Sequence, residues 1–235
     1  MFCGKMKALT FSYDDGVTQD RQLLRIFEKY GLHATFNLNS GLFGSAAAFY
    51  DKNRNRTFPH VRLRETEIAA VYAGHEVAVH TRTHPVLKDL SDDAILREVE
   101  DDRLALSALV GYDVIGMAYP VGSCAVTPHV AQVIRDGTPI LYARTTTSTH
   151  SFDLPADPML WHPTARHGEK EKLLELADRF LALEAQTPQV FYIWGHAYEF
   201  ERDDDWEWFD AFCRRISGRS DIFYGTNREI LESAR

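Results

Sequence analysis

Apolar runs alternate with stretches of helical periodicity from one end of this 235-residue chain to the other. The apolar runs predict strands at Lys7–Phe11, Ala34–Asn39, Glu76–His80, Val114–Ala118, Ile140–Arg144, Val190–Trp194 and Ile222–Tyr224. The periodic stretches predict helices at residues 21–30, 64–73, 92–110, 128–137, 169–183, 206–217 and 228–233. Such alternation is typical of a parallel sheet wrapped by helices, and a barrel is its natural closure. We therefore expect a single α/β domain over residues 1–235.

The composition limits the possible partners. The formal charge is -8, from 26 basic and 34 acidic side chains, and the chain has no basic run. Electrostatic attraction to nucleic acid or to anionic lipid is therefore not expected. The first residues contain neither the apolar segment of a signal peptide nor a membrane span, which predicts a cytoplasmic protein. The three scattered cysteines fit free thiols in a reducing compartment.

Residues with catalytic potential follow the predicted strands at their carboxyl ends. They are Asp14 and Asp15 after the first strand, His80 at the end of the third, Tyr119 and Pro120 after the fourth, Arg144 at the end of the fifth and His196 after the sixth. In a parallel barrel these strand ends form one rim, and active sites are built there. The sequence therefore predicts a single site on that rim.

Asp15, His80 and His84 are the residue types that bind a divalent metal. Two histidines four residues apart lie about one helical turn from each other, so both rings can reach one ion. Three protein ligands leave the fourth position open for water, as in catalytic rather than structural sites. We expect zinc, although the same ligands accept Co, Ni, Fe or Mn. A lone Asp-Asp-Gly turn or a lone His-x-x-x-His would be coincidental, and only their combination favours a metal.

The second acid of the pair has a different expected role. Asp14 remains off the metal and accepts a proton from water, and Gly16 permits the sharp turn that separates the two carboxylates. His196 projects from the same rim and can protonate a leaving nitrogen, although a structural histidine is the alternative. Arg144 either orients Asp14 or binds substrate.

A long segment, residues 145–168, is expected to shape the substrate pocket on this rim. Trp161 and His167 are its candidate substrate-binding residues, and Tyr119, Pro120 and Arg144 are further candidates on the same rim. Trp161 either stacks on a sugar ring or fills a core. Another segment, residues 199–210, is rich in acids. We interpret it as a solvated loop and helix start without a catalytic role.

The order of these motifs resembles the polysaccharide deacetylase family, also called the NodB homology domain or carbohydrate esterase family 4. Thr10-Phe11-Ser12-Tyr13-Asp14-Asp15-Gly16 is similar to the family's first motif, Thr-Phe-Asp-Asp-Gly. His80-Thr81-Arg82-Thr83-His84 matches its second motif, and Tyr119-Pro120-Val121-Gly122 resembles its third. The resemblance implies a distorted (β/α)7 TIM-like barrel, with Asp14 as base, Asp15 and both histidines as metal ligands, and His196 as general acid.

Two features depart from the family pattern. Ala118 stands where the third motif usually has an arginine that orients the base, and Val121 stands in place of an aromatic residue. The orienting function is expected to have moved to Arg144. The fourth motif, an Asp and Trp that position the catalytic histidine, is not recognisable, and Asp157 and Trp161 are its nearest candidates.

The function expected from the residues and the resemblance is metal-dependent hydrolysis of acetyl groups from N-acetylated sugars or oligosaccharides. One rival is an amidohydrolase that acts on a non-carbohydrate C–N bond. The other is a catalytically silent carbohydrate-binding relative. Retention of both Asp14 and His196 disfavours the silent relative, because a binding protein needs neither a base nor an acid.

Overall fold

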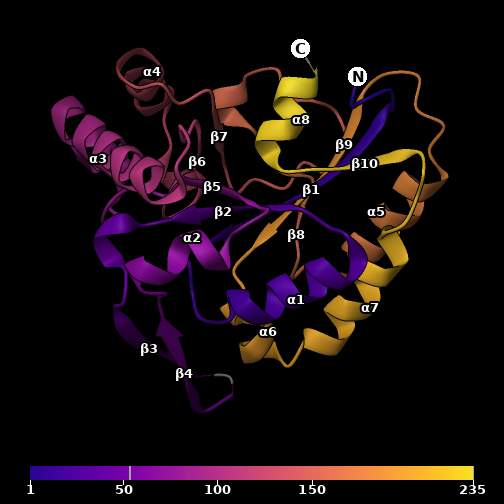
Figure 1. Cartoon of the computed structure of the whole chain (residues 1–235), viewed down its shortest axis with the longest axis horizontal. Coiled ribbons are helices and arrows are strands. Elements are labelled where there is room, and N and C mark those ends of the chain that lie inside the picture. Colours follow the sequence, from indigo (N-terminus) through magenta and orange to yellow (C-terminus); the bar gives the residue numbers. More distant parts are fainter. Residues whose placement is uncertain (53, 235) are drawn as a thin grey trace.

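The computed structural model describes residues 1–52 and 54–234. Its centre is a parallel sheet around strand β1 (Lys7–Asp14), which is buried along its whole length. From one edge to the other the strands are β7 (Tyr142–Arg144), β6 (Gly116–Ala118), β5 (Glu76–Val79), β2 (Ala34–Leu38), β1, β9 (Gln189–Gly195) and β8 (Ala165–Arg166). An eighth strand, β10 (Ile222–Tyr224), pairs with the first residues of β1. The expected distorted (β/α)7 barrel is thus confirmed (Figure 1).

One short segment, residues 161–167, contains β8 and closes the barrel between β7 and β9. On the β7 side, the amide of Trp161 donates to the carbonyl of Ala143 at 2.9 Å, and the amide of Thr145 donates to the carbonyl of Trp161 at 3.0 Å. On the β9 side, the amide of Thr164 donates to the carbonyl of Tyr192 at 2.8 Å. The closing segment therefore forms backbone hydrogen bonds with both strands.

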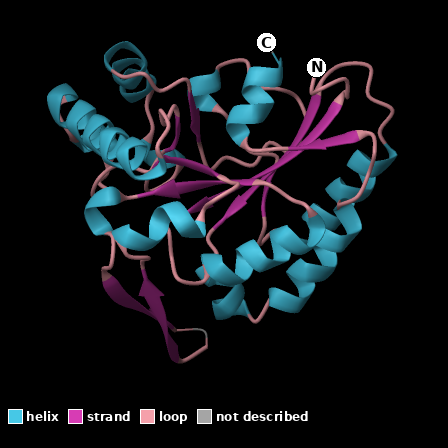
Figure 2. Cartoon of the chain, viewed as in Figure 1, coloured by secondary structure: helices cyan, strands magenta, loops and turns pink. Residues whose placement is uncertain are grey.

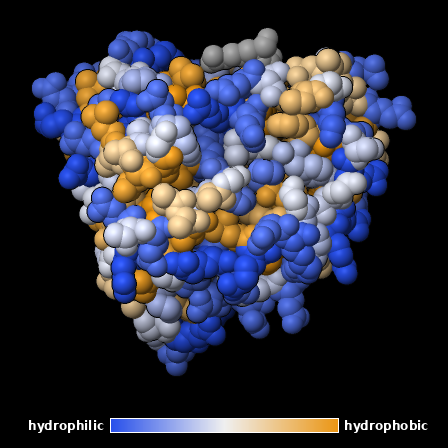
Figure 3. Space-filling view, viewed as in Figure 1, coloured by the Kyte–Doolittle hydropathy of each residue, from blue (hydrophilic) through white to orange (hydrophobic). Residues whose placement is uncertain are grey.

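Helices cover the outside of the sheet, as Figures 1 and 2 show. They are α1 (Asp20–Tyr30), α2 (Ile68–Val71), α3 (Asp92–Val110), α4 (Pro128–Gly137), α5 (Lys170–Ala182), α6 (Tyr198–Asp203), α7 (Trp206–Ile216) and α8 (Asn227–Ala234). No helix in the described residues has the length and apolar character needed to cross a bilayer. The surface in Figure 3 is largely hydrophilic, with apolar patches interrupted by polar residues.

Alternation along β1 separates the two sides of the sheet. Leu9, Phe11 and Tyr13 belong to the larger apolar cluster, and Phe11 and Tyr13 pack their rings against Phe27 of α1. Ala8 belongs to a second cluster, and Asp14 continues its side of the strand because successive side chains point to opposite faces. This register brings Asp14 to the carboxyl end of the barrel.

Three elements were not expected from the sequence. Residues 46–61 form an antiparallel hairpin of β3 (Ala46–Asp51) and β4 (Arg56–Val61), in a region for which no strand or helix was expected. Residue 53 lies outside the described residues. The other two are α6 and the short strand β8. The expected helix at residues 64–73 is also shorter, because only Ile68–Val71 is α-helical.

Candidate active site

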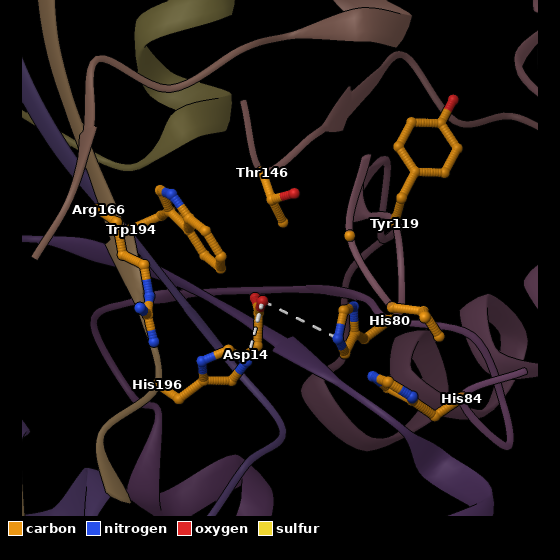
Figure 4. Close-up of a pocket in the computed structure, with 10 residues that line it drawn as sticks. Asp14, His80, His84, Tyr119, Thr146, Arg166, Trp194 and His196 are labelled. Atoms are coloured by element: carbon orange, nitrogen blue, oxygen red, sulfur yellow. Dashed lines mark ion pairs between the residues drawn. The ribbon is translucent and has the colours of Figure 1, made fainter. Parts of the chain in front are cut away.

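The three expected metal ligands meet at the rim of the barrel. Asp15 follows β1, and His80 and His84 follow β5. One side-chain donor atom from each residue lies within 4.8 Å of the other two. Figure 4 shows the two imidazoles side by side at one end of the pocket. A carboxylate oxygen and two imidazole nitrogens so arranged fit a single divalent ion such as zinc.

The two histidines reach this arrangement through a loop, and the expectation of a helical turn was wrong. Thr81 has φ 66° and His84 has φ 60°, and these left-handed conformations bend the backbone so that the rings lie 4.9 Å apart between centroids. The side-chain amide of Asn39 donates to the carbonyls of His80 and Thr81 at 2.6 and 2.8 Å. Helix α3 adds Glu98, whose carboxylate accepts from the amide of Thr83 at 2.8 Å. The bend is therefore held from both sides.

His80 is prepared for metal binding by its own surroundings. Its Nδ1 donates to the carbonyl of Ala118 at 2.8 Å, which leaves the Nε2 lone pair free. Burial lowers the pKa of His80 to about 4, so the ring is neutral at physiological pH. A neutral imidazole with a fixed tautomer is the form that binds metals.

Asp15 is held by one side chain from β4 and one from the residue that follows it. Nε2 of His60 lies 3.1 Å from Oδ2, and Nη2 of Arg62 donates to Oδ1 at 3.0 Å. Burial alone would raise the pKa of Asp15, but the hydrogen bond to His60 and the nearby charges keep that pKa far below its usual value. The sequence analysis missed both residues because His60 belongs to β4, which was not recognised as a strand, and Arg62 directly follows that strand. Their i, i+2 spacing, which places both on one face of a strand, was the available signal.

Asp14 lies beside the three ligands and has its own partners. Nη2 of Arg144 donates to Oδ1 at 2.6 Å, and the side-chain amide of Asn37 donates to the same oxygen at 2.8 Å. Oδ2 lies 3.9 Å from Nε2 of His80 and 3.8 Å from Nε2 of His196, as the dashed lines in Figure 4 mark. Burial would raise the pKa of Asp14, but Arg144 and the two histidines lower it. Asp14 is therefore an ionised carboxylate that can accept a proton.

Arg144 occupies a place beneath Asp14 and does not line the cavity. Its side chain is 0% exposed, and its guanidinium lies 4.5 Å from the ring centre of Trp194. Of the two expected roles, the contact with Asp14 and the full burial of Arg144 favour orientation of Asp14 over direct contact with substrate. The arginine missing from position 118 thus has a counterpart one strand further along the sheet.

His196 follows β9, and Figure 4 shows it beside Asp14, across from His84. Its Nδ1 lies 3.4 Å from a carboxylate oxygen of Glu199. Burial would lower the pKa of His196, but the carboxylates of Glu199, Asp14 and Asp15 raise it to about 9. The imidazole is therefore protonated at neutral pH, as a general acid requires.

Glu199 corrects the interpretation of the acidic segment. This residue lies in the first turn of α6, and its side chain is only 4% exposed. Besides His196, it contacts His167 at 2.8 Å and forms an ion pair with Arg166. The opposite charges and hydrogen bonds keep its pKa well below the usual value, although burial would raise it. A buried carboxylate three residues after the histidine thus occupies the place beside His196 that was expected for Asp157.

His167 does not contact the cavity, which corrects its expected role in substrate binding. Its Nε2 lies 2.8 Å from Glu199, and its Nδ1 lies 3.2 Å from the hydroxyl of Tyr13. The ring packs 4.2 Å from the ring centre of Phe200. The imidazole of His167 thus lies between the carboxylate of Glu199 and the hydroxyl of Tyr13, on the side of Glu199 away from the cavity.

Trp161 and Asp157 also lie away from the site. Trp161 is 1% exposed and packs edge-on against Tyr142 and Tyr192 in the second apolar cluster, so it cannot stack on a sugar. Asp157 is 41% exposed and pairs with Arg135 at 2.7 Å on the surface. The prediction of substrate contact for Trp161 and the assignment of the fourth motif to either residue were therefore wrong.

A cavity of about 400 Å³ opens above the metal-ligand cluster. Its lining residues are Asp14, His80, His84, Tyr119, Val121, Gly122, Thr146, Arg166, Trp194 and His196. Pro120 is not among them, and Figure 4 shows the ring of Tyr119 turned away from the pocket, where its hydroxyl donates to the carbonyl of Met159. The sequence analysis did not single out Thr146, Arg166 or Trp194.

The comparisons with known proteins agree with this geometry. The family model described as polysaccharide deacetylase matches residues 3–136. None of the curated proteins compared with the chain matches it.

Three solved structures have the same fold at low identity. A family 4 acetyl xylan esterase from Clostridium thermocellum, in complex with a cobalt ion, has a TM-score of 0.58 and 15% identity over 96% of this chain and 91% of that one. A family 4 carbohydrate esterase from Streptomyces lividans, in complex with acetate, has a TM-score of 0.56 and 14% identity over 94% and 92%. The peptidoglycan deacetylase PdaC from Bacillus subtilis has a TM-score of 0.52 and 16% identity over 97% and 91%.

The matched region contains the aspartate pair and both rim histidines, and the shared fold extends beyond it to His196. More than half of the 235 residues lie within the match, and this chain is therefore a member of the polysaccharide deacetylase family, the family 4 carbohydrate esterases.

Proposed function

We propose that this protein is a metal-dependent deacetylase that removes acetyl groups from N-acetylated sugars or short oligosaccharides. The observation that carries the proposal is that a candidate metal site lies next to a possible base and a possible acid. The Asp15, His80 and His84 cluster adjoins an ionised carboxylate, Asp14, and a protonated imidazole, His196. Hydrolysis of an acetamide needs a base for water and an acid for the departing nitrogen, and these two groups supply them.

Asp15, His80 and His84 would hold the divalent ion. When bound, such an ion supplies Lewis acidity that makes water more acidic and polarises a carbonyl oxygen. The fixed tautomer of His80 and the double hydrogen bonding of Asp15 suit that role, because orienting partners of this kind support metal ligands. The complex of the Clostridium thermocellum esterase with cobalt supports a divalent metal in this family.

The proton movements follow from the contacts of the two catalytic residues. Asp14 receives a proton from water, while Arg144 and Asn37 keep its carboxylate in one orientation. His196 gives its proton to the nitrogen of the leaving amine. Glu199 orients the imidazole and stabilises its charged form before the transfer. Asp14 and His196 face each other at 3.8 Å, so the base and the acid act on the same bound group.

The names of the structural relatives include both a peptidoglycan deacetylase and an acetyl xylan esterase. Hydrolysis of O-acetyl esters is therefore the second candidate. A protonated acid close to the leaving atom favours an amide, because an amine leaves only when protonated and an alcohol needs less assistance. We expect both reactions to use the same residues, with the amide as the preferred substrate.

The test is release of acetate by the zinc-loaded protein. The substrates are N-acetylglucosamine oligomers, O-acetylated xylo-oligosaccharides and small cyclic amides, and the control is Asp14→Asn. We expect acetate from the amino sugars, little product from the cyclic amides, and loss of at least about 100-fold in rate in the variant. Binding of sugars without any hydrolysis would instead identify a silent relative. Ring opening of cyclic amides would identify an amidohydrolase of another class.

A further inference from the structure

Arg166 differs from the other arginines near the site because its side chain faces the cavity. It lies at the end of β8, inside the segment that closes the barrel, and its side chain is 38% exposed. Figure 4 shows it beside His196, on the opposite side of Asp14 from His84. A substrate whose acetyl group reaches Asp14 therefore passes next to this guanidinium.

The remaining arginines of the region have their charges matched. Arg144 is fully buried against Asp14, and Arg62 is held by Asp15. Arg202 makes two hydrogen bonds of 2.8 Å to Asp203 and does not line the cavity. These guanidiniums therefore leave no unbalanced charge for a ligand.

The guanidinium of Arg166 has a single hydrogen-bonding partner among the described residues. Its Nη2 donates to Glu199, whose carboxylate also serves His196 and His167. One negative charge is thus shared by two cations of the cavity wall, Arg166 and the protonated His196. The contact with Glu199 fixes one end of the guanidinium, while Nη1 and Nε have no partner in the described part of the chain.

No other described residue that lines the cavity offers an acceptor in place for Nη1 and Nε of Arg166. Asp14 is the one carboxylate among the described residues that line the cavity, and Arg144 already engages it. Val121, Gly122, Thr146 and Trp194 are uncharged. An arginine held at one end and open at the other is suited to bind a carboxylate through two parallel hydrogen bonds.

We propose that Arg166 is a specificity-determining residue that binds a carboxylate of the substrate, so that this enzyme acts on acetamido sugars that carry an acid group. The proposal rests on the deacetylase function proposed above. The cavity of about 400 Å³ is of the size that accepts a small ligand such as one or two sugar rings. An acid group close to the acetamido group can therefore reach Arg166.

Two acid and amide pairs test this inference. One pair is N-acetylglucosaminuronic acid and its 6-carboxamide. The other carries a lactyl ether on O3, again as the acid and as the primary amide. Within each pair the two compounds differ mainly in charge. For the zinc-loaded wild type we expect at least one acid to be preferred over its amide about tenfold in kcat/KM, chiefly through KM.

Arg166→Met should abolish that preference, and Arg166→Lys should keep part of it because the charge remains. Arg202→Met is the matched control, since Arg202 also lies near Glu199, at 3.8 Å, but outside the cavity, and it should keep the full preference. A change in His196 caused by the loss of Arg166 alters both members of a pair equally, so the acid-to-amide ratio isolates the carboxylate contact.

The outcomes separate the two proposals. Equal turnover of acid and amide in both pairs, or a preference that survives in Arg166→Met, overturns the role of Arg166 while leaving deacetylation intact. If no acetate is released, the proposed function fails. In that case calorimetry measures the dissociation constants of the acid and of the amide in each pair. Equal affinity for the acid and the amide also overturns the inference.

Discussion

The carboxylate of Glu199 lies 3.4 Å from Nδ1 of His196, three residues earlier in the chain. The carboxylate is buried, and His167 and Arg166 hold it on its other sides. It acts on the imidazole in two ways, by fixing the orientation of the ring and by favouring its charged form.

Glu199→Gln should therefore weaken the general acid. Glu199 is the largest of the contributions that raise the pKa of His196 to about 9, so its removal lowers that pKa. The protonated form is then lost at lower pH, and the alkaline limb of the pH–rate profile moves toward neutrality. We expect kcat to fall about 10- to 100-fold at pH 8. Glu201→Gln, on the same helix but at the surface, should leave the profile unchanged, and an unshifted limb in Glu199→Gln contradicts the assignment.

Arg144→Met should shift the acidic limb of the pH–rate profile. Arg144 is the strongest of the interactions that lower the pKa of Asp14, so without it that pKa rises and the base is protonated over a wider pH range. We expect the acidic limb of kcat/KM to move to higher pH and the rate at pH 7 to fall roughly 100-fold. Because a buried carboxylate loses its partner, the free energy of unfolding should also decrease by about 3 kcal/mol. Wild-type rates in Arg144→Met at every pH would show that Arg144 does not keep Asp14 ionised.

His60→Ala should weaken metal binding. The Nε2 atom of His60 lies 3.1 Å from Asp15, and the loss of such an orienting partner typically reduces metal affinity 10- to 100-fold. Zinc titration by calorimetry measures the effect directly. His129→Ala is the matched control, since His129 is exposed on α4 and pairs with Asp92 at the surface. Equal zinc affinity in both variants would show that the hairpin contributes nothing to the metal site.

Asp20→Asn should change how stability depends on pH. Burial raises the pKa of Asp20 to about 8, from a value near 3.9 in the unfolded chain, and Tyr72 donates to its Oδ2 at 2.6 Å. Between these two values the folded protein binds one more proton than the unfolded chain, so stability falls as pH rises, by about 1.4 kcal/mol per pH unit. The contribution is fully present below pH 4 and is lost above pH 8.

Urea unfolding at pH 5 and pH 9 measures this difference. The variant should be less sensitive to pH than the wild type and more stable than it at pH 9, because it has no carboxylate to bury. Asp178→Asn, at an exposed position on α5, serves as the control. The same pH dependence in Asp20→Asn and in the wild type would refute this account.

The parts of the fold that the sequence predicted are those with strong periodicity. The apolar runs located β1, β2, β5, β6, β7, β9 and β10, and their order placed Asp14, His80 and His196 on one rim. The hairpin was missed because all residues of β3 from Ala46 to Tyr50 are exposed and give no buried pattern. Strand β8 has two residues, too few for any periodicity.

The sequence identified the candidate ligands and catalytic residues that the structure brings together, and it missed the residues that contact them from behind. Asp15, His80 and His84 carry a recognisable spacing, whereas Glu199 lies in an acidic run that is usually solvated. The i, i+3 relation between His196 and Glu199 was visible in the sequence. Its meaning depended on a helix starting at Tyr198, which the sequence analysis did not predict.

The segment that joins the two edges of the barrel also carries Arg166, and this has a consequence for how the enzyme can diversify. Trp161 and Thr164 anchor the segment to different neighbours by backbone hydrogen bonds, which do not depend on which side chain stands at position 166. If Arg166 selects an acid group as proposed, substitution at position 166 changes substrate preference and leaves the backbone pairing of the closing segment intact. An engineer seeking new selectivity would begin there, since the scaffold and the hydrolytic groups remain as they are.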